Sequence, residues 1–178
     1  MIEIVNVSTE NLCDVNITNH PFEVIGRIKP QYADGIWTYE EELYEKSYMK
    51  HYPNDEEDYS TYIDNNDKTI FLAYSEAECI GQIVLRKDWN LNAFIEDISV
   101  SDHARGMGVG SALINEAKKW ALKSGLHGLA LETQDNNLKA CRFYKKCGFE
   151  IGAVNSMLYK NFEKPWSDEI AIFWYLRF

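Results

Sequence analysis

The sequence predicts a single α/β (α+β) domain spanning residues 1–178, with helices flanking a mostly antiparallel, mixed β-sheet. Three observations predict this fold. Apolar, β-branched runs alternate with two amphipathic segments of helical period. Short polar turns join several of the runs, which favours antiparallel pairs. Repeats, low-complexity tracts and linkers are absent, and the length suits one core.

The N-terminal third is expected to contain two strands and two short helices. Residues 2–7 and 21–28 read as strands, and Ser8 is predicted to cap a helix that ends near residue 16. A second helix is predicted to begin in the acidic run 54–58 and to continue through residue 63. Between them, residues 29–52 form an aromatic and acidic stretch that includes Trp37. Its aromatic rings and carboxylates suit a cationic ligand, while packing of an irregular segment against the core is the alternative.

The remainder alternates strands with two helices. Strands are expected at residues 70–74, 79–85, 93–100, 128–133, 149–154 and 170–176, the first two forming a hairpin across a polar turn. One helix follows residue 110 and is closed by Gly125, with Leu113, Ala117, Trp120 and Ala121 on its apolar face. The other covers residues 138–147 and is closed by Gly148.

Charge is distributed unevenly along a chain whose net charge is −10. Residues 1–97 hold 20 acids and 7 bases, whereas residues 98–178 hold 8 acids and 11 bases. We interpret this as an acidic part that attracts a cationic substrate and a later part that binds an anionic cofactor; a solvated acidic surface is the alternative. Either way the balance disfavours nucleic acid as a partner.

Cysteine spacing and hydropathy indicate the compartment. The four cysteines form no C-x-x-C pair and no metal-ligand rhythm with the histidines, so we expect reduced thiols and no metal. A nucleophilic cysteine is the alternative, but no histidine lies in a recognisable partner motif. No apolar run is long enough for a membrane helix, and the N-terminus lacks signal-peptide features. We therefore expect a cytoplasmic protein that does not associate with membranes.

A glycine-rich turn links the strand at 93–100 to the helix that follows. Gly106, Gly108 and Gly110 stand two residues apart, so backbone N–H groups can face an anion at the positive end of the helix dipole. The lysine of a Walker A loop is missing, and the spacing differs from the Rossmann fingerprint. A pyrophosphate would fit this turn, although glycines also close ordinary turns.

Two motifs together resemble the GNAT N-acetyltransferases. One is Arg105-x-x-Gly108-x-Gly110, and the other is Asn137-x-x-Ala140-x-x-Phe143-Tyr144-x-Lys146-x-Gly148-Phe149. Further segments resemble the streptothricin acetyltransferases over nearly the whole chain: residues 22–26, 89–90, 95–98, 131–137, 157–159 and 173–178. The resemblance implies a GNAT fold, with cofactor motifs at residues 95–150 and an acceptor site shaped by residues 1–70 and 155–178.

The implied activity is acetyl-CoA-dependent acetylation of an amine on the β-lysine moiety of streptothricin. An ammonium cannot attack a thioester, so a base must remove a proton, and the departing thiolate needs one. By resemblance, Tyr144 protonates the sulfur. Cofactor binding falls to two stretches: Ile98, Ser99, Val100, Arg105, Gly106, Met107, Gly108, Val109, Gly110 and Ser111 in the first, and Asn137, Ala140, Phe143, Tyr144 and Lys146 in the second. Asn137 is expected to bind the pantetheine arm, to cap its helix, or both; Tyr144 could instead be a core residue.

The base and the acceptor contacts come from acidic and aromatic residues. Glu96 is our candidate base, with electrostatic anchoring of the substrate ammonium as the alternative. Strand alternation places Asp97 on the opposite face. Glu96, Asp97, Trp37 and Glu132 are the predicted acceptor contacts.

Two other functions fit the same motifs. One is a GNAT enzyme acting on a polyamine, an aminoglycoside or a protein lysine, and the other is a non-catalytic acyl-CoA-binding module. The sequence leaves the oligomeric state open, a homodimer included.

Overall fold

The computed structural model describes residues 1–178, which divide into two compact units. The first comprises residues 1–21, 51–129 and 178, and the second comprises residues 22–50 and 130–177. No helix has the length and apolar character needed to cross a membrane. Whether the chain acts as a single domain stays a prediction.

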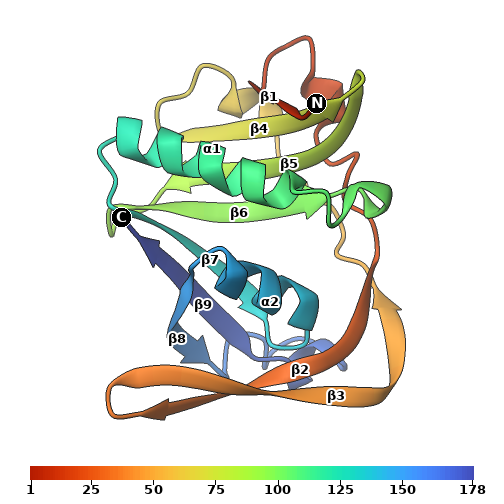
Figure 1. Cartoon of the computed structure of the whole chain (residues 1–178), viewed down its shortest axis with the longest axis vertical. Coiled ribbons are helices and arrows are strands. Elements are labelled where there is room, and N and C mark those ends of the chain that lie inside the picture. The colour runs from red at the N-terminus through yellow and green to blue at the C-terminus, as the bar shows by residue number, and fades with distance from the viewer. The chain divides into compact units, whose positions relative to one another are not determined.

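The first unit is an antiparallel sheet with one long helix lying along it (Figure 1). Neighbouring strands follow the order β1-β4-β5-β6 and pair antiparallel. Their bounds are β1 Glu3–Asn6, β4 Lys68–Ser75, β5 Glu78–Lys87 and β6 Asn92–Val100, and helix α1 covers Val109–Lys123. The predicted hairpin is confirmed as β4–β5, whose turn places Glu76 and Ala77 at positive φ.

Both faces of this sheet bury apolar side chains. Helix α1 contributes Leu113, Ala117 and Ala121, all fully buried as their spacing predicts, whereas Trp120 of the same predicted face is half-buried. A second cluster contains Tyr62, Ile70, Leu72 and Val84, together with Val7 and Cys79. Because Ile70 pairs with Val84 and Leu72 with Gln82, this cluster marks one face of β4 and β5. Strand β6 adds the buried side chains of Ala93 and Ile95, so packing also fixes the strand that leads into the glycine turn.

The second unit combines a three-stranded arrangement, one helix and a long hairpin (Figure 1). The strands follow the order β7-β9-β8, with β8 and β9 antiparallel. Their bounds are β7 Gly128–Gln134, whose first two residues belong to the first unit, β8 Glu150–Asn155 and β9 Ala171–Arg177. Helix α2 covers Leu138–Lys146, and the hairpin consists of β2 Phe22–Ala33 and β3 Ile36–Lys50.

The hairpin occupies most of residues 29–52, where no strand was predicted from the sequence. Asp34 and Gly35 form its turn with φ of 51° and 80°, and Tyr32 pairs with Trp37 beside it. Asp-Gly is a favoured dipeptide for such turns, so this signal could have revealed the hairpin. The sequence of β3 shows no clear alternation of apolar and polar residues, because most of its side chains are exposed. Ion pairs such as Glu41–Arg142 attach the hairpin to α2.

Both predicted N-terminal helices are wrong. Only 3₁₀ turns form, at Leu12–Asp14 and Tyr59–Tyr62, with others at Asp102–Ala104 and Trp166–Asp168. Ser8 does not cap a helix; its N–H donates to the Asn11 side chain. Asn16 at φ 69° then turns the chain away. Asp58 does cap the 3₁₀ turn, because its side chain accepts from Ser60 N–H. The segment is nevertheless too short to offset the free-energy cost of helix nucleation.

Candidate active site

The glycine turn leaves backbone donors at the start of α1 outside the helix hydrogen-bond ladder. Gly106 and Gly108 adopt φ of 82° and 90°, and Gly108 is the N-cap of α1. The first i→i−4 hydrogen bond runs from Ala112 N–H to Gly108 C=O. The N–H groups of Val109, Gly110 and Ser111 thus precede the helix hydrogen-bond ladder. Such donors at a helix N-terminus attract an anion.

Arg105 spans the entry to this turn. Its Nε donates to the Val100 carbonyl at 3.1 Å and its Nη1 to the Pro21 carbonyl at 3.4 Å. The side chain therefore ties the end of β6 to the N-terminal segment while remaining exposed. Met107 beside it is 68% exposed. The structure brings these residues together with Ile98, Ser99 and Val100 in one strand–turn–helix.

A β-bulge interrupts β6 at Glu96. Leu85 pairs with Ile95 and Val84 with Asp97, leaving Glu96 as the extra residue. A bulge of this kind redirects side chains and breaks alternation. Glu96 Oε1 accepts from Arg86 Nε at 2.9 Å, and Oε2 accepts from the Tyr62 hydroxyl at 2.9 Å.

Asp97 lies in a different polar setting. Its Oδ2 accepts from Gln82 Nε2 at 2.6 Å. Gln82 is fully buried, and Asn16 N–H donates to its Oε1 at 2.6 Å, which fixes the orientation of the amide. Burial raises the pKa of Asp97, and the hydrogen bond from Gln82 opposes this effect.

The bulge corrects the expectation that Glu96 and Asp97 occupy opposite faces. Gln82 and Arg86 stand four residues apart on β5 and so share a face. Glu96 bonds to Arg86, and Asp97 bonds to Gln82. The bulge thus directs both carboxylates to partners on the same side of the sheet. Farther along this strand, the Ser99 hydroxyl lies 2.8 Å from that of Thr18.

In the second unit, the predicted cofactor residues gather on α2. Asn137 caps the helix, its Oδ1 accepting from Ala140 N–H at 3.3 Å, as one of the two roles foreseen for it. The Tyr144 ring is buried among aromatic rings and lies 5.8 Å from that of Phe149, 6.2 Å from that of Trp174 and 5.4 Å from that of Phe143. This packing holds the phenol in one orientation. Lys146 is exposed.

The other two predicted acceptor contacts lie on different elements of this unit. Trp37 stands near the hairpin turn with its ring tilted against Tyr32 at 4.9 Å. Glu132 is on β7 and accepts a hydrogen bond from the Tyr159 hydroxyl. Burial raises the pKa of Glu132, and the hydrogen bond from Tyr159 opposes this. Both side chains remain candidates.

Several hydrogen bonds and ion pairs could not be predicted from the sequence. Arg86 and Tyr62 hold Glu96, and Gln82 holds Asp97. In the second unit, Lys50 and Glu169 form a buried pair at 2.5 Å, and a further pair joins Arg27 to Asp135 at 2.6 Å. Their members are far apart in the sequence and form no motif, so only tertiary structure reveals them.

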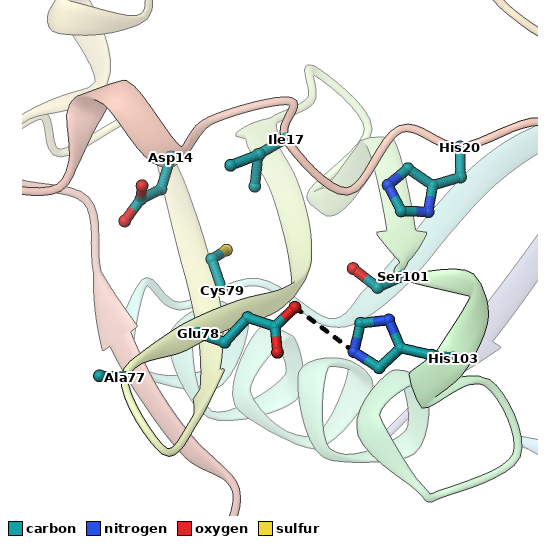
Figure 2. Close-up of a pocket in the computed structure, with 8 residues that line it drawn as sticks. All are labelled: Asp14, Ile17, His20, Ala77, Glu78, Cys79, Ser101 and His103. Carbon is teal, nitrogen blue, oxygen red and sulfur yellow. Dashed lines mark ion pairs between the residues drawn. The ribbon is translucent and has the colours of Figure 1, made fainter.

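The first unit also contains a pocket beyond the end of β6 (Figure 2). His103 pairs with Glu78 across it at 3.5 Å. None of the predicted catalytic residues lines it. Its lining consists of Asp14, Ile17, His20, Ala77, Glu78, Cys79, Ser101 and His103.

All four cysteines are free thiols. Burial raises the pKa of Cys79, and that of Cys141 to about 12. Because the thiolate is the nucleophilic form, these two buried thiols are poor nucleophiles. This weakens the alternative of cysteine chemistry at both positions.

Comparison with known proteins agrees with this arrangement. The model of the acetyltransferase (GNAT) family matches residues 34–149. Streptothricin acetyltransferase A of Bacillus subtilis (strain 168) is 48% identical over 98% of this chain and 99% of its own length. A streptothricin acetyltransferase of Escherichia coli is 41% identical over 72% of this chain and 70% of its own.

A similar crystal structure includes a ligand. It is that of a protein from Bacillus anthracis str. Ames assigned as a streptothricin acetyltransferase, in complex with acetyl coenzyme A. It is 40% identical, covers 100% of this chain and 99% of its own, and has a TM-score of 0.91. The predicted α+β fold is confirmed, and the chain belongs to the acetyltransferase (GNAT) family.

Proposed function

We propose that this protein transfers the acetyl group of acetyl-CoA to an amine of streptothricin, on its β-lysine moiety, and so confers resistance. The observation that carries the proposal is the 48% identity, over nearly both full lengths, to a streptothricin acetyltransferase. The similar chain that binds acetyl coenzyme A supports the choice of donor. The GNAT family supplies the reaction type.

The glycine turn suits the cofactor's pyrophosphate. The N–H groups of Val109, Gly110 and Ser111 precede the helix hydrogen-bond ladder, and Gly106 and Gly108 supply the φ values of 82° and 90° that the turn requires. The positive end of the α1 dipole favours the negative charge. Arg105 adds a guanidinium, and Ile98 to Val100 offer backbone groups to the pantetheine and thioester. Asn137, Ala140, Phe143 and Lys146 complete the proposed cofactor contacts.

The reaction needs two proton movements. The acceptor ammonium loses one proton to a base, and the neutral amine then attacks the thioester carbon. The C–S bond breaks, and the sulfur takes a proton, which we assign to Tyr144 because its packed ring holds the hydroxyl in one orientation. No metal is needed for this chemistry.

The acidic side chains suit a cationic acceptor. Residues 1–97 carry 20 acids against 7 bases, and this charge speeds the encounter with a cation. Of the two roles open to Glu96, its contacts with Arg86 and Tyr62 favour an anchor for a substrate ammonium. Trp37, Asp97 and Glu132 are further proposed contacts.

The reaction also indicates where the protein acts. Acetyl-CoA is supplied in the cytoplasm, where cysteines stay reduced, so we place the enzyme there. The net charge of −10 disfavours nucleic acid as a partner. We treat residues 1–178 as one catalytic domain.

Release of free thiol from acetyl-CoA on adding streptothricin tests the proposal. We expect turnover with streptothricin to exceed that with a polyamine, an aminoglycoside or a lysine peptide, compared as kcat/KM. Preference for one of those amines would reassign the acceptor. Acetyl-CoA binding without thiol release from any amine would indicate the non-catalytic module.

A further inference from the structure

Two adjacent carboxylates on β6 could accept the proton from the acceptor amine, and their partners differ. This question rests on the proposed function, because it concerns the base in that reaction. Glu96 is the bulged residue, and Asp97 follows it in the strand. Both act from the same side of the sheet, immediately before the segment Ile98–Val100.

Glu96 already has both oxygens engaged. Oε1 pairs with the Arg86 guanidinium at 2.9 Å, and Oε2 lies 2.9 Å from the Tyr62 hydroxyl, whose single proton is shared with the Glu57 carboxylate, also 2.9 Å away. Tyr62 is 1% exposed and cannot swing away from its cluster. A proton placed on Oε1 would have to displace a cation that stays charged at every working pH. These contacts therefore favour Glu96 as an anchor rather than as the acceptor of the amine proton.

Asp97 is held by a neutral group instead. The Gln82 amide donates to Oδ2, and Asn16 fixes that amide through its own N–H and side chain. The clamp orients the carboxylate without supplying a positive charge. Protonation of Asp97 therefore breaks no ion pair, and the clamp can remain.

The surroundings of Asp97 also favour its role as a base, because they raise its pKa overall. Burial raises its pKa, and the nearby Asp55 carboxylate raises it further, while contacts from Gln82, Ser99 and the Ile98 N–H lower it. Tyr59, whose own pKa is raised by burial, also faces it. A carboxylate of raised pKa is a better general base near neutral pH than an ordinary one.

We propose that Asp97 is the general base, that Gln82 is its positioning residue, and that Glu96 anchors the acceptor without taking its proton. An N–H bond of the ammonium breaks as an O–H bond forms on Asp97. The neutral amine attacks the acetyl carbon and the C–S bond breaks. The second amine proton passes to the sulfur through the proposed acid, and Asp97 returns its proton to solvent.

The test is the pH dependence of kcat/KM for streptothricin with Asp97→Asn. We expect a loss of about 10²- to 10⁴-fold near neutral pH, the usual range for a general base. The loss should shrink as pH rises, because the variant depends on amine that is already neutral. The wild-type kcat/KM should fall as pH drops through the pKa of Asp97, which gives the pH profile an acidic limb. The variant should lack this acidic limb.

Three companion variants separate this role from a structural one. Glu96→Gln should mainly raise KM. Gln82→Met should lower kcat while retaining the acidic limb, because the base is misaligned but present. Asp55→Asn should move that limb to lower pH, because it removes a charge that raises the pKa of Asp97. Acetyl-CoA binding by each variant checks its fold.

The outcomes are distinguishable. Suppose that the wild type acetylates streptothricin, that Asp97→Asn is equally active, and that Glu96→Gln lacks the acidic limb of the pH profile. This result would overturn the assignment of the base and leave the proposed function intact. An unmoved limb in Asp55→Asn would also contradict it, even if Asp97→Asn failed to fold. A wild type inactive on streptothricin would overturn the proposed function and this inference together.

Discussion

Two ion pairs, one in each unit, use the same chemistry in contrasting surroundings. Arg86 and Glu96 are 39% and 30% exposed, whereas Lys50 and Glu169 are 7% and 6% exposed. An exposed pair contributes little to stability, while a buried pair becomes costly once one partner is removed. The contrast teaches that the charge near the β6 bulge can serve a ligand, and that the charge beside the hairpin holds the fold.

Removing the buried ammonium should have the largest effect. Lys50→Met leaves the buried Glu169 carboxylate without its cation, and only the Asn136 amide still donates to it, at 3.0 Å. We expect the free energy of unfolding to fall by about 3 to 5 kcal/mol, as measured by urea denaturation. Adding Glu169→Leu should recover part of the loss. A single variant as stable as the wild type would show that burial does not distinguish the pairs.

Tyr144→Phe should affect turnover without a comparable effect on stability. The ring contacts with Phe149 and Trp174 remain, and only the hydroxyl is lost. We expect kcat to fall about 10- to 1000-fold, with unfolding free energy changed by about 1 kcal/mol and acetyl-CoA affinity kept. Steady-state kinetics and calorimetry would measure these. Unchanged turnover would remove Tyr144 from the acid role.

The exposed pair gives the matched comparison. Arg86→Gln should lower the free energy of unfolding by at most about 1 kcal/mol, because solvent screens the interaction. The same urea titration used for Lys50→Met measures it. A loss as large as that of Lys50→Met would break the contrast between the two units.

The smallest effect concerns the pH dependence of stability. Burial raises the pKa of Glu132 in the folded state, so the folded protein binds its proton more readily than the unfolded chain. That stabilising contribution is complete below the unfolded-state pKa and is lost as pH rises through the folded-state pKa. Wild type should therefore gain stability relative to Glu132→Gln as pH falls, measured by melting temperature at several pH values. A difference independent of pH would contradict this.

The sequence predicted those elements whose signals are local. Strands β4 to β6 have buried apolar runs, and α1 and α2 have a glycine turn and an asparagine cap at their starts. The long hairpin was missed because exposed glutamates and tyrosines hide its alternation, although Asp34-Gly35 marked its turn. The two N-terminal helices were wrong because capping residues alone do not offset the cost of nucleation.

In the site, too, features with a local sequence signal were predicted and features set by tertiary packing were not. Motif spacing predicted that the glycine turn precedes α1 and that Asn137 begins α2. The bulge at Glu96 could not be predicted, because it depends on the register of β5 against β6. Gln82 was missed for a related reason: its partners Asn16 and Asp97 lie 66 and 15 residues away. Such pairings follow from tertiary packing.

Mass spectrometry of streptothricin after incubation with the enzyme and acetyl-CoA tests the central claim most directly. We expect a mass increase of one acetyl group, which fragmentation locates on the β-lysine moiety, and no increase when acetyl-CoA is omitted. Unmodified streptothricin, under conditions where the enzyme acetylates another amine, would contradict the account.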